Sequence, residues 1–147
     1  MRVLLIFVLS LTISVPVWSD PLDLGKSTTS MDAATRDNGL SYEVSCPEEA
    51  SAAEACVTDK PTYLGWRTFH AHCFQCHGGS ALGSTFAPNL LDRLNQHVDF
   101  ERFEYVLNHG YSGRTGAMPS FEKNKQVLKN LSGIYLYLRA RAADILP

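Results

Sequence analysis

The stretch Cys73-Phe74-Gln75-Cys76-His77 decides how the whole chain is interpreted. It has the form C-x-x-C-H, which is the attachment pattern of a c-type haem. Two thiols three positions apart at the end of a helix can each form a thioether with one haem vinyl group. The next residue, His77, is then carried under the iron as its proximal ligand. The motif therefore predicts one covalently attached haem c, bound through Cys73 and Cys76.

Three other interpretations of this motif fit the sequence less well. A thioredoxin-like C-x-x-C pair belongs beside a βαβ pattern, and none is visible in the sequence. A zinc site needs four ligands, and the chain has no second C-x-x-C pair. A structural disulfide between Cys73 and Cys76 would leave His77 without a role.

A haem with both axial positions filled needs a second ligand, and Met118 is the predicted one. It lies in a Gly- and Pro-containing loop, 41 residues after His77. Pro119 restricts the local backbone, and the neighbouring glycines let the loop approach a flat ligand closely. A methionine opposite a histidine raises the haem potential relative to two histidines. His109 or His97 is the alternative distal ligand.

Two further residues are predicted to support the haem. Pro88 lies in a loop from which its carbonyl can accept a hydrogen bond from the imidazole N–H of His77. Arg114, close to Met118, is a candidate partner for a haem propionate. An ordinary turn proline and a solvent-exposed arginine are the simpler interpretations of these two residues.

Residues 1–19 have the pattern of a secretory signal peptide. Arg2 supplies the positive charge, residues 3–17 are mainly apolar, and a cleavage site before Asp20 is plausible. Pro16 interrupts the apolar run, which is also shorter than the roughly 20 residues of a membrane span. We therefore expect an exported, periplasmic protein without a stable membrane anchor.

The composition is that of one globular domain with an uneven distribution of charge. The 147 residues are 45% apolar, with 13 Lys and Arg against 15 Asp and Glu. Residues 20–59 carry a net charge of -7, and residues 60–147 carry +4. Such a composition excludes collagen, a long coiled coil and a wholly disordered chain. The slightly acidic total argues against nucleic acid as a partner.

The periodicity of apolar residues predicts an all-α domain over residues 60–147. Helices are expected from Pro61 onward, between Asp99 and Gly110, and over residues 124–143. The stretches 80–94 and 111–120 contain several Gly and Pro residues and are expected to be loops. No strand is predicted.

Residues 20–59 are polar and acidic, and they are predicted to form an irregular extension. This extension contains Cys46 and Cys56, an even pair of cysteines in an exported protein. A disulfide between them is the expected arrangement. Free reactive thiols and contacts with a partner protein are the alternatives.

The chain from Tyr63 to Leu146 resembles a class I c-type cytochrome. The matching positions are Gly65 and Phe69 before the haem motif, Ile134 and Tyr137 on the last helix, Pro88-Asn89-Leu90, and Met118-Pro119. The resemblance implies three to five helices around a covalent haem c. It also implies an electron-transfer protein rather than an enzyme.

Four shorter segments resemble the small periplasmic cytochromes associated with quinoprotein (PQQ-dependent) alcohol dehydrogenases, including those of methanol metabolism. These segments are residues 63–70, 83–90, 118–121 and 135–141. The resemblance implies a single-electron carrier that accepts electrons from such a dehydrogenase. It would pass them to a cytochrome or an oxidase of the respiratory chain. The alternative is a haem enzyme or a gas-binding sensor with a displaceable distal ligand.

Overall fold

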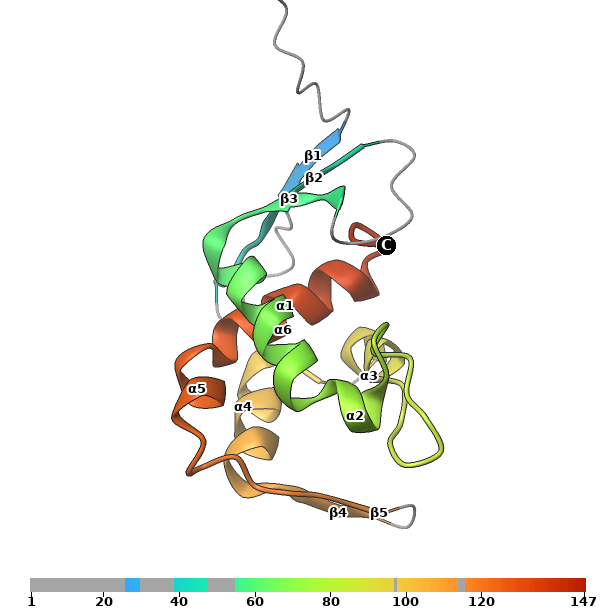
Figure 1. The fold of residues 1–147 in the computed structure, drawn as a ribbon, viewed down its shortest axis with the longest axis vertical. Coiled ribbons are helices and arrows are strands. Elements are labelled where there is room, and N and C mark those ends of the chain that lie inside the picture. The colour runs from blue at the N-terminus through green and yellow to red at the C-terminus, as the bar shows by residue number, and fades with distance from the viewer. Residues whose placement is uncertain (1–25, 30–38, 48–54, 97, 114–115) are drawn as a thin grey trace, which may run out of the picture.

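The computed structural model describes residues 26–29, 39–47, 55–96, 98–113 and 116–147. The predicted signal peptide, Arg114 and His97 lie outside these residues. The described elements, in chain order, are β1 (Lys26–Thr29), β2 (Glu43–Cys46), β3 (Val57–Thr58), α1 (Lys60–His72), α2 (Phe74–His77), α3 (Leu90–Gln96), α4 (Phe100–His109), β4 (Tyr111–Gly113), β5 (Gly116–Met118), α5 (Lys125–Lys129) and α6 (Leu131–Ala142). Figure 1 shows β1–β3 at one end of the molecule and β4–β5 at the other, with the helices between them.

Local capping residues set the ends of two predicted helices. The carboxylate of Asp59 accepts a hydrogen bond from the backbone N–H of Thr62 at 2.7 Å, and Pro61 occupies the first turn of α1. Asp99 caps α4 in the same way. Gly110 ends α4 with a φ of 77°, a left-handed conformation that favours glycine.

The core is built around α6, most of which is buried. The ring of Tyr135 contacts the rings of Phe100 and Phe103 of α4, with centroids 5.3 Å apart in both pairs. Two residues further along, Tyr137 contacts Phe69 of α1 at 5.5 Å. These contacts hold α1 and α4 on α6, and they fix the frame in which the haem motif is placed.

The last helical segment is divided in two, whereas its apolar periodicity predicts one helix over residues 124–143. The break falls at Asn130, which separates α5 from α6. Its side-chain Nδ2 donates to the hydroxyl of Thr68 on α1 at 2.9 Å. Asparagine competes with regular helical bonding through such local and tertiary hydrogen bonds, which explains the break.

The N-terminal extension contains a small antiparallel sheet, in the order β1-β2-β3, where no strand was expected. These strands have four residues or fewer, too short for a recognisable alternation of apolar residues. Tyr42 and Val44 are buried and belong to the hydrophobic core. Asp59 also accepts from the backbone N–H of Glu43 at 2.7 Å, so the α1 cap connects helix and sheet.

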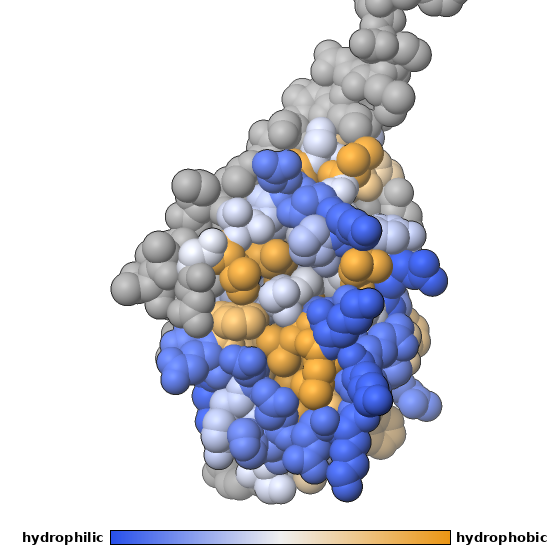
Figure 2. Space-filling view, turned by 90° about the vertical axis from the view of Figure 1, so that its left-hand side faces the viewer, coloured by the Kyte–Doolittle hydropathy of each residue, from blue (hydrophilic) through white to orange (hydrophobic). Residues whose placement is uncertain are grey.

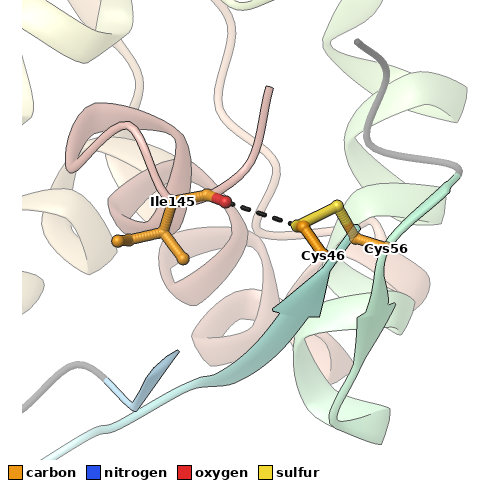
Figure 3. Close-up of a disulfide and its surroundings, with 3 residues drawn as sticks. All are labelled: Cys46, Cys56 and Ile145. Atoms are coloured by element: carbon orange, nitrogen blue, oxygen red, sulfur yellow. Dashed lines mark hydrogen bonds between the residues drawn. A yellow bond between two sulfur atoms is a disulfide. The ribbon is translucent and has the colours of Figure 1, made fainter. Parts of the chain in front are cut away.

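A disulfide joins Cys46 of β2 to Cys56, which confirms the predicted pairing (Figure 3). The Sγ atom of Cys46 lies 3.4 Å from the carbonyl oxygen of Ile145, the contact drawn as a dashed line. Since a disulfide sulfur carries no hydrogen, this is a packing contact between sulfur and oxygen. The disulfide therefore packs the extension against the C-terminal end of the chain, where Leu146 is buried.

Two stretches that were expected to be loops contain regular structure. Helix α3 begins at Leu90, because the side chain of Asn89 accepts from the backbone N–H groups of Leu91 and Asp92. Strands β4 and β5 form an antiparallel pair in which Tyr111 lies opposite Met118. The segment that carries Met118 is therefore held by backbone pairing.

The surface is polar around isolated apolar areas. On the face that carries α5, apolar side chains gather near the centre and hydrophilic side chains surround them (Figure 2). Among the described residues, no helix has the length and apolar character needed to cross a membrane.

Candidate haem site

A cavity of about 710 Å³ opens between the haem-motif helices, α3, α4 and the β4–β5 pair. Its volume falls within the range of about 300–1,000 Å³ that is typical of small-molecule and cofactor sites. Much of its wall is apolar, with Phe69, Leu94 and Leu138 among the residues that form it. The structure brings five of the predicted site residues to this one cavity: Cys73, Cys76, His77, Pro88 and Met118.

The two motif cysteines lie where α1 ends and α2 begins. Cys73 is the N-cap of α2 and is buried, whereas Cys76 is exposed, and both are free thiols. Burial, with a smaller contribution from the neighbouring Cys76, raises the pKa of the Cys73 thiol to about 11. Cys73 is therefore protonated at neutral pH. A haem attached here would be joined by addition of the S–H across a vinyl double bond, for which the protonated thiol would supply the hydrogen.

The imidazole of His77 is oriented by a backbone carbonyl. Its Nδ1 lies 3.2 Å from the carbonyl oxygen of Pro88. A carbonyl can only accept, so Nδ1 carries the hydrogen and Nε2 keeps its lone pair for a metal. Burial lowers the pKa of His77, and the hydrogen bond to Pro88 opposes this effect only in part. The ring is thus held neutral, which is the form that ligates iron.

The loop between His77 and Pro88 folds back on itself to place this carbonyl. The backbone N–H of Gly83 donates to the carbonyl of His77 at 2.9 Å. Gly83 has a φ of 89°, and a Cβ atom there would come within 2.7 Å of the Pro88 carbonyl carbon. Only glycine fits this position, because both the backbone conformation and the close approach exclude a side chain.

Met118 occupies the end of β5 and forms part of the cavity wall. The close contact between Gly110 and the Met118 carbonyl fixes its position, since a Cβ on Gly110 would lie 2.7 Å from that oxygen. His109, the alternative distal ligand, is exposed and is not part of the cavity wall. Its Nδ1 lies 2.9 Å from the Tyr105 carbonyl, and its ring stacks on that of Tyr105.

The cavity wall also includes three further residues with basic side chains. They are His72, Arg93 and Arg102. Arg93 and Arg102 come from α3 and α4, and their positive charge suits a ligand that carries carboxylates. Only the position of His72, directly before the motif, marks it in the sequence. The predicted propionate partner Arg114 lies outside the described residues.

The residues at the cavity fit a haem better than a bare metal ion. Within the described ranges, no group of three or more His, Cys, Asp or Glu side chains is placed to hold such an ion. The imidazole of His77, the thioether of Met118 and the thiols of Cys73 and Cys76 instead line a largely apolar cavity of suitable size. Imidazole and thioether groups are of the kinds that haem iron takes as ligands, and two thiols are what covalent attachment of a haem requires.

Comparisons with known proteins agree with this chemistry. The family model described as cytochrome c oxidase, cbb3-type, subunit III matches residues 62–138. Cytochrome c-555 of Methylococcus capsulatus is 32% identical over 99 residues, which are 67% of this chain and 76% of that protein. The chain belongs to the c-type cytochrome family. This cytochrome carries electrons, and its cofactor is a covalently attached haem c. The predicted class I cytochrome c fold is thereby confirmed.

Two other relatives of this c-type cytochrome are longer proteins. Cytochrome c-553I of Paracoccus denitrificans is 32% identical over 114 residues, which are 76% of this chain and 50% of that protein. The crystal structure of the c-type cytochrome XoxG from Methylobacterium extorquens AM1 is 41% identical, with a TM-score of 0.57. That match covers 61% of this chain and 55% of XoxG. This chain thus spans about half the length of each of these two relatives.

Proposed function

We propose that Cys73 and Cys76 attach the haem, and that His77 and Met118 are its axial ligands. The observation that carries this proposal is that His77 and Met118 belong to the wall of one cavity, from which His109 is absent. With both axial positions filled by the protein, the iron has no position for a substrate. The cytochrome then works as a single-electron carrier and not as an enzyme.

The electron donor in this proposal is a periplasmic quinoprotein (PQQ-dependent) alcohol dehydrogenase. Support comes from the resemblance of residues 63–70, 83–90, 118–121 and 135–141 to cytochromes that serve such dehydrogenases. The pattern of a secretory signal peptide supports a periplasmic location. A second cytochrome or an oxidase of the respiratory chain is the proposed acceptor.

The partners are proposed to contact the mouth of the cavity. Phe86 and Tyr111 both belong to the cavity wall, yet their side chains are 78% and 54% exposed. Single exposed apolar side chains are common, but two of them in the wall of one cavity make its mouth a candidate interaction site. Arg93 and Arg102 add positive charge to the same cavity wall. A partner that docks here approaches the edge of the haem, which shortens the path of the electron.

Absorption spectroscopy of the purified protein tests the ligand assignment. The oxidised protein should show the weak sulfur-to-iron band near the red end of the spectrum, and the band should vanish on reduction. Carbon monoxide should bind the reduced protein slowly or not at all. A covalent haem without this band, together with rapid and complete binding of carbon monoxide, would instead indicate a haem enzyme or a sensor.

Stopped-flow reduction by a purified PQQ-dependent alcohol dehydrogenase tests the partner and the docking surface. Wild-type protein should be reduced rapidly when the dehydrogenase has received its alcohol. Phe86→Ser should lower the second-order rate constant about tenfold, because it removes a large apolar contact from the interface. Val57→Ser is the control, since Val57 is 55% exposed but lies on β3. Equal rates for both variants would contradict the proposed docking surface.

A further inference from the structure

The side-chain amide of Asn124 is fixed by the start of α5. Its Oδ1 accepts hydrogen bonds from the backbone N–H groups of Gln126 and Val127, both at 3.1 Å. Only the oxygen of an amide can accept, so this N-cap settles which of its two terminal atoms is the nitrogen. The Nδ2 group therefore points away from α5.

This Nδ2 group lies 3.4 Å from Nδ1 of His72, a long hydrogen bond. Because an amide nitrogen donates, Nδ1 of His72 must accept, and the imidazole then carries its hydrogen on Nε2. The Nε2 atom is buried and has no hydrogen-bond partner among the described residues. Within that part of the chain, the ring of His72 is thus held by one hydrogen bond, which Asn124 supplies.

The hydrogen bond connects the two sides of the haem cavity. His72 is the last residue of α1 and directly precedes the first cysteine of the motif. Asn124 is the last residue of the segment that starts at Met118. In this segment the N–H of Phe121 donates to a carbonyl of α4 at 2.7 Å, and the N–H of Asn124 donates to the Phe121 carbonyl at 2.8 Å. His72, Met118 and Phe121 all belong to the cavity wall.

We propose that His72 is a positioning residue for Met118, and that its hydrogen bond with Asn124 holds residues 118–124 closed over the cavity. The inference rests on the proposed function, in which Met118 is the distal ligand. A methionine on a connecting segment leaves the iron only when the segment opens locally. Opening breaks the His72–Asn124 bond and leaves both nitrogens of the imidazole without a partner among the described residues. The bond therefore favours the closed segment.

A second hydrogen bond of similar kind provides a matched control. At the other end of α5, Nδ2 of Asn130 donates to the hydroxyl of Thr68 on α1 at 2.9 Å. This bond also joins α1 to the C-terminal helices. It lies at the C-terminal end of α5, whereas the Met118 segment lies before the N-terminal end of α5. Thr68→Val removes it at nearly constant volume. Its loss should lower overall stability without opening the segment that carries Met118.

Binding of imidazole to the oxidised holoprotein reports on this opening. Imidazole reaches the iron only after the Met118 sulfur has left, so its apparent affinity is proportional to the open fraction. Loss of one hydrogen bond of ordinary strength changes such a fraction about fivefold. We therefore expect His72→Phe to bind imidazole about fivefold more tightly than wild type. His72→Gln should remain near wild type, because the Gln oxygen can accept from Asn124.

The test is a spectroscopic titration with imidazole, in parallel with thermal unfolding of each variant. Thr68→Val should change the imidazole affinity less than twofold even where it lowers the thermal midpoint as much as His72→Phe. Asn124→Ser gives a second variant, because serine keeps the N-cap of α5 but cannot reach His72. Its affinity for imidazole should also rise about fivefold.

Two outcomes would overturn the inference while leaving the ligand assignment intact. One is an unchanged imidazole affinity in His72→Phe and Asn124→Ser. The other is an equal rise in Thr68→Val. Met118→Ala separates these from failure of the proposed function. If the red-end band and the imidazole affinity of this variant equal those of wild type, Met118 is not the ligand. Both the ligand assignment and the positioning role of His72 are then wrong.

Discussion

Gly65 on α1 lies directly against the carbonyl group of Gly133 on α6. A Cβ atom on Gly65 would overlap that carbonyl, and a Cβ on Gly133 would overlap the carbonyl of Pro61. No side-chain rotation can relieve these overlaps, because the opposing atoms belong to the backbone. The two glycines therefore set the distance at which α1 and α6 cross. That crossing fixes the haem motif, which follows directly at the end of α1.

Replacing Gly65 by alanine should lower the free energy of unfolding by about 3 kcal/mol, because the two helices must move apart to admit the methyl group. The measurement is urea unfolding of the holoprotein, followed by far-UV circular dichroism. Arg67→Ala is the control, since Arg67 is exposed on the same helix and its change should stay within about 0.5 kcal/mol. Equal unfolding midpoints for the two variants would show that the close crossing is not needed.

Removal of the disulfide with the double substitution Cys46→Ala and Cys56→Ala should destabilise the holoprotein by about 3 kcal/mol. The two cysteines are separated by 10 residues, and chain entropy assigns roughly this value to a loop of that size. Thermal unfolding measures this loss. Wild-type protein under reducing conditions should have the same thermal midpoint as the double variant. The haem spectrum should stay unchanged. The disulfide would have no stabilising role if the double variant and the oxidised wild type unfolded at the same temperature.

Short-range patterns in the sequence were sufficient to predict which residues form the candidate haem site. Cys73, Cys76 and His77 are neighbours on the chain, and Pro88 and Met118 lie in stretches that their Gly and Pro residues mark. The structure places all five in the wall of one cavity. The hydrogen bond between His72 and Asn124 was not predictable, because its partners are 52 residues apart and no local pattern pairs them.

The same distinction between local and distant causes applies to the fold. Asp99 and Gly110 mark the ends of α4 through their own backbone and side-chain chemistry, so these ends were predicted. The break between α5 and α6 depends on Thr68, which lies 62 residues from Asn130. The strands of the extension have four residues or fewer and are defined by pairing, so they left no periodic pattern to detect.

Gly83→Ala should raise the reduction potential. A side chain at this position conflicts with the backbone of Pro88 and with a φ of 89°, so the loop must shift. The Pro88 carbonyl then moves from Nδ1 of His77, and the imidazole becomes a poorer electron donor to the iron. The oxidised state loses more stability than the reduced state. We expect a rise of about 40 mV, which corresponds to a fivefold change in a one-electron equilibrium.

A redox titration of the Gly83 variant checks this value, and Gly39→Ala is its control. Gly39 has a φ of 74°, so alanine meets a comparable backbone strain there, but nothing lies within 4 Å of the added Cβ. The control should keep the wild-type potential. A rise of equal size in both variants would trace the effect to general strain rather than to the Pro88 carbonyl.

Met118→Ala should lower the reduction potential, since a thioether opposite histidine favours the reduced iron and its loss removes that preference. The expected drop is on the order of 100 mV, well inside the roughly 0.8 V that axial ligands can span. The variant should also lose the red-end band and bind carbon monoxide rapidly when reduced. Met118→His is the matched comparison, because an imidazole there fills the axial position again. It should lower the potential as well, but it should bind carbon monoxide slowly. The assignment of Met118 fails if the alanine variant keeps both the potential and the spectrum of wild type.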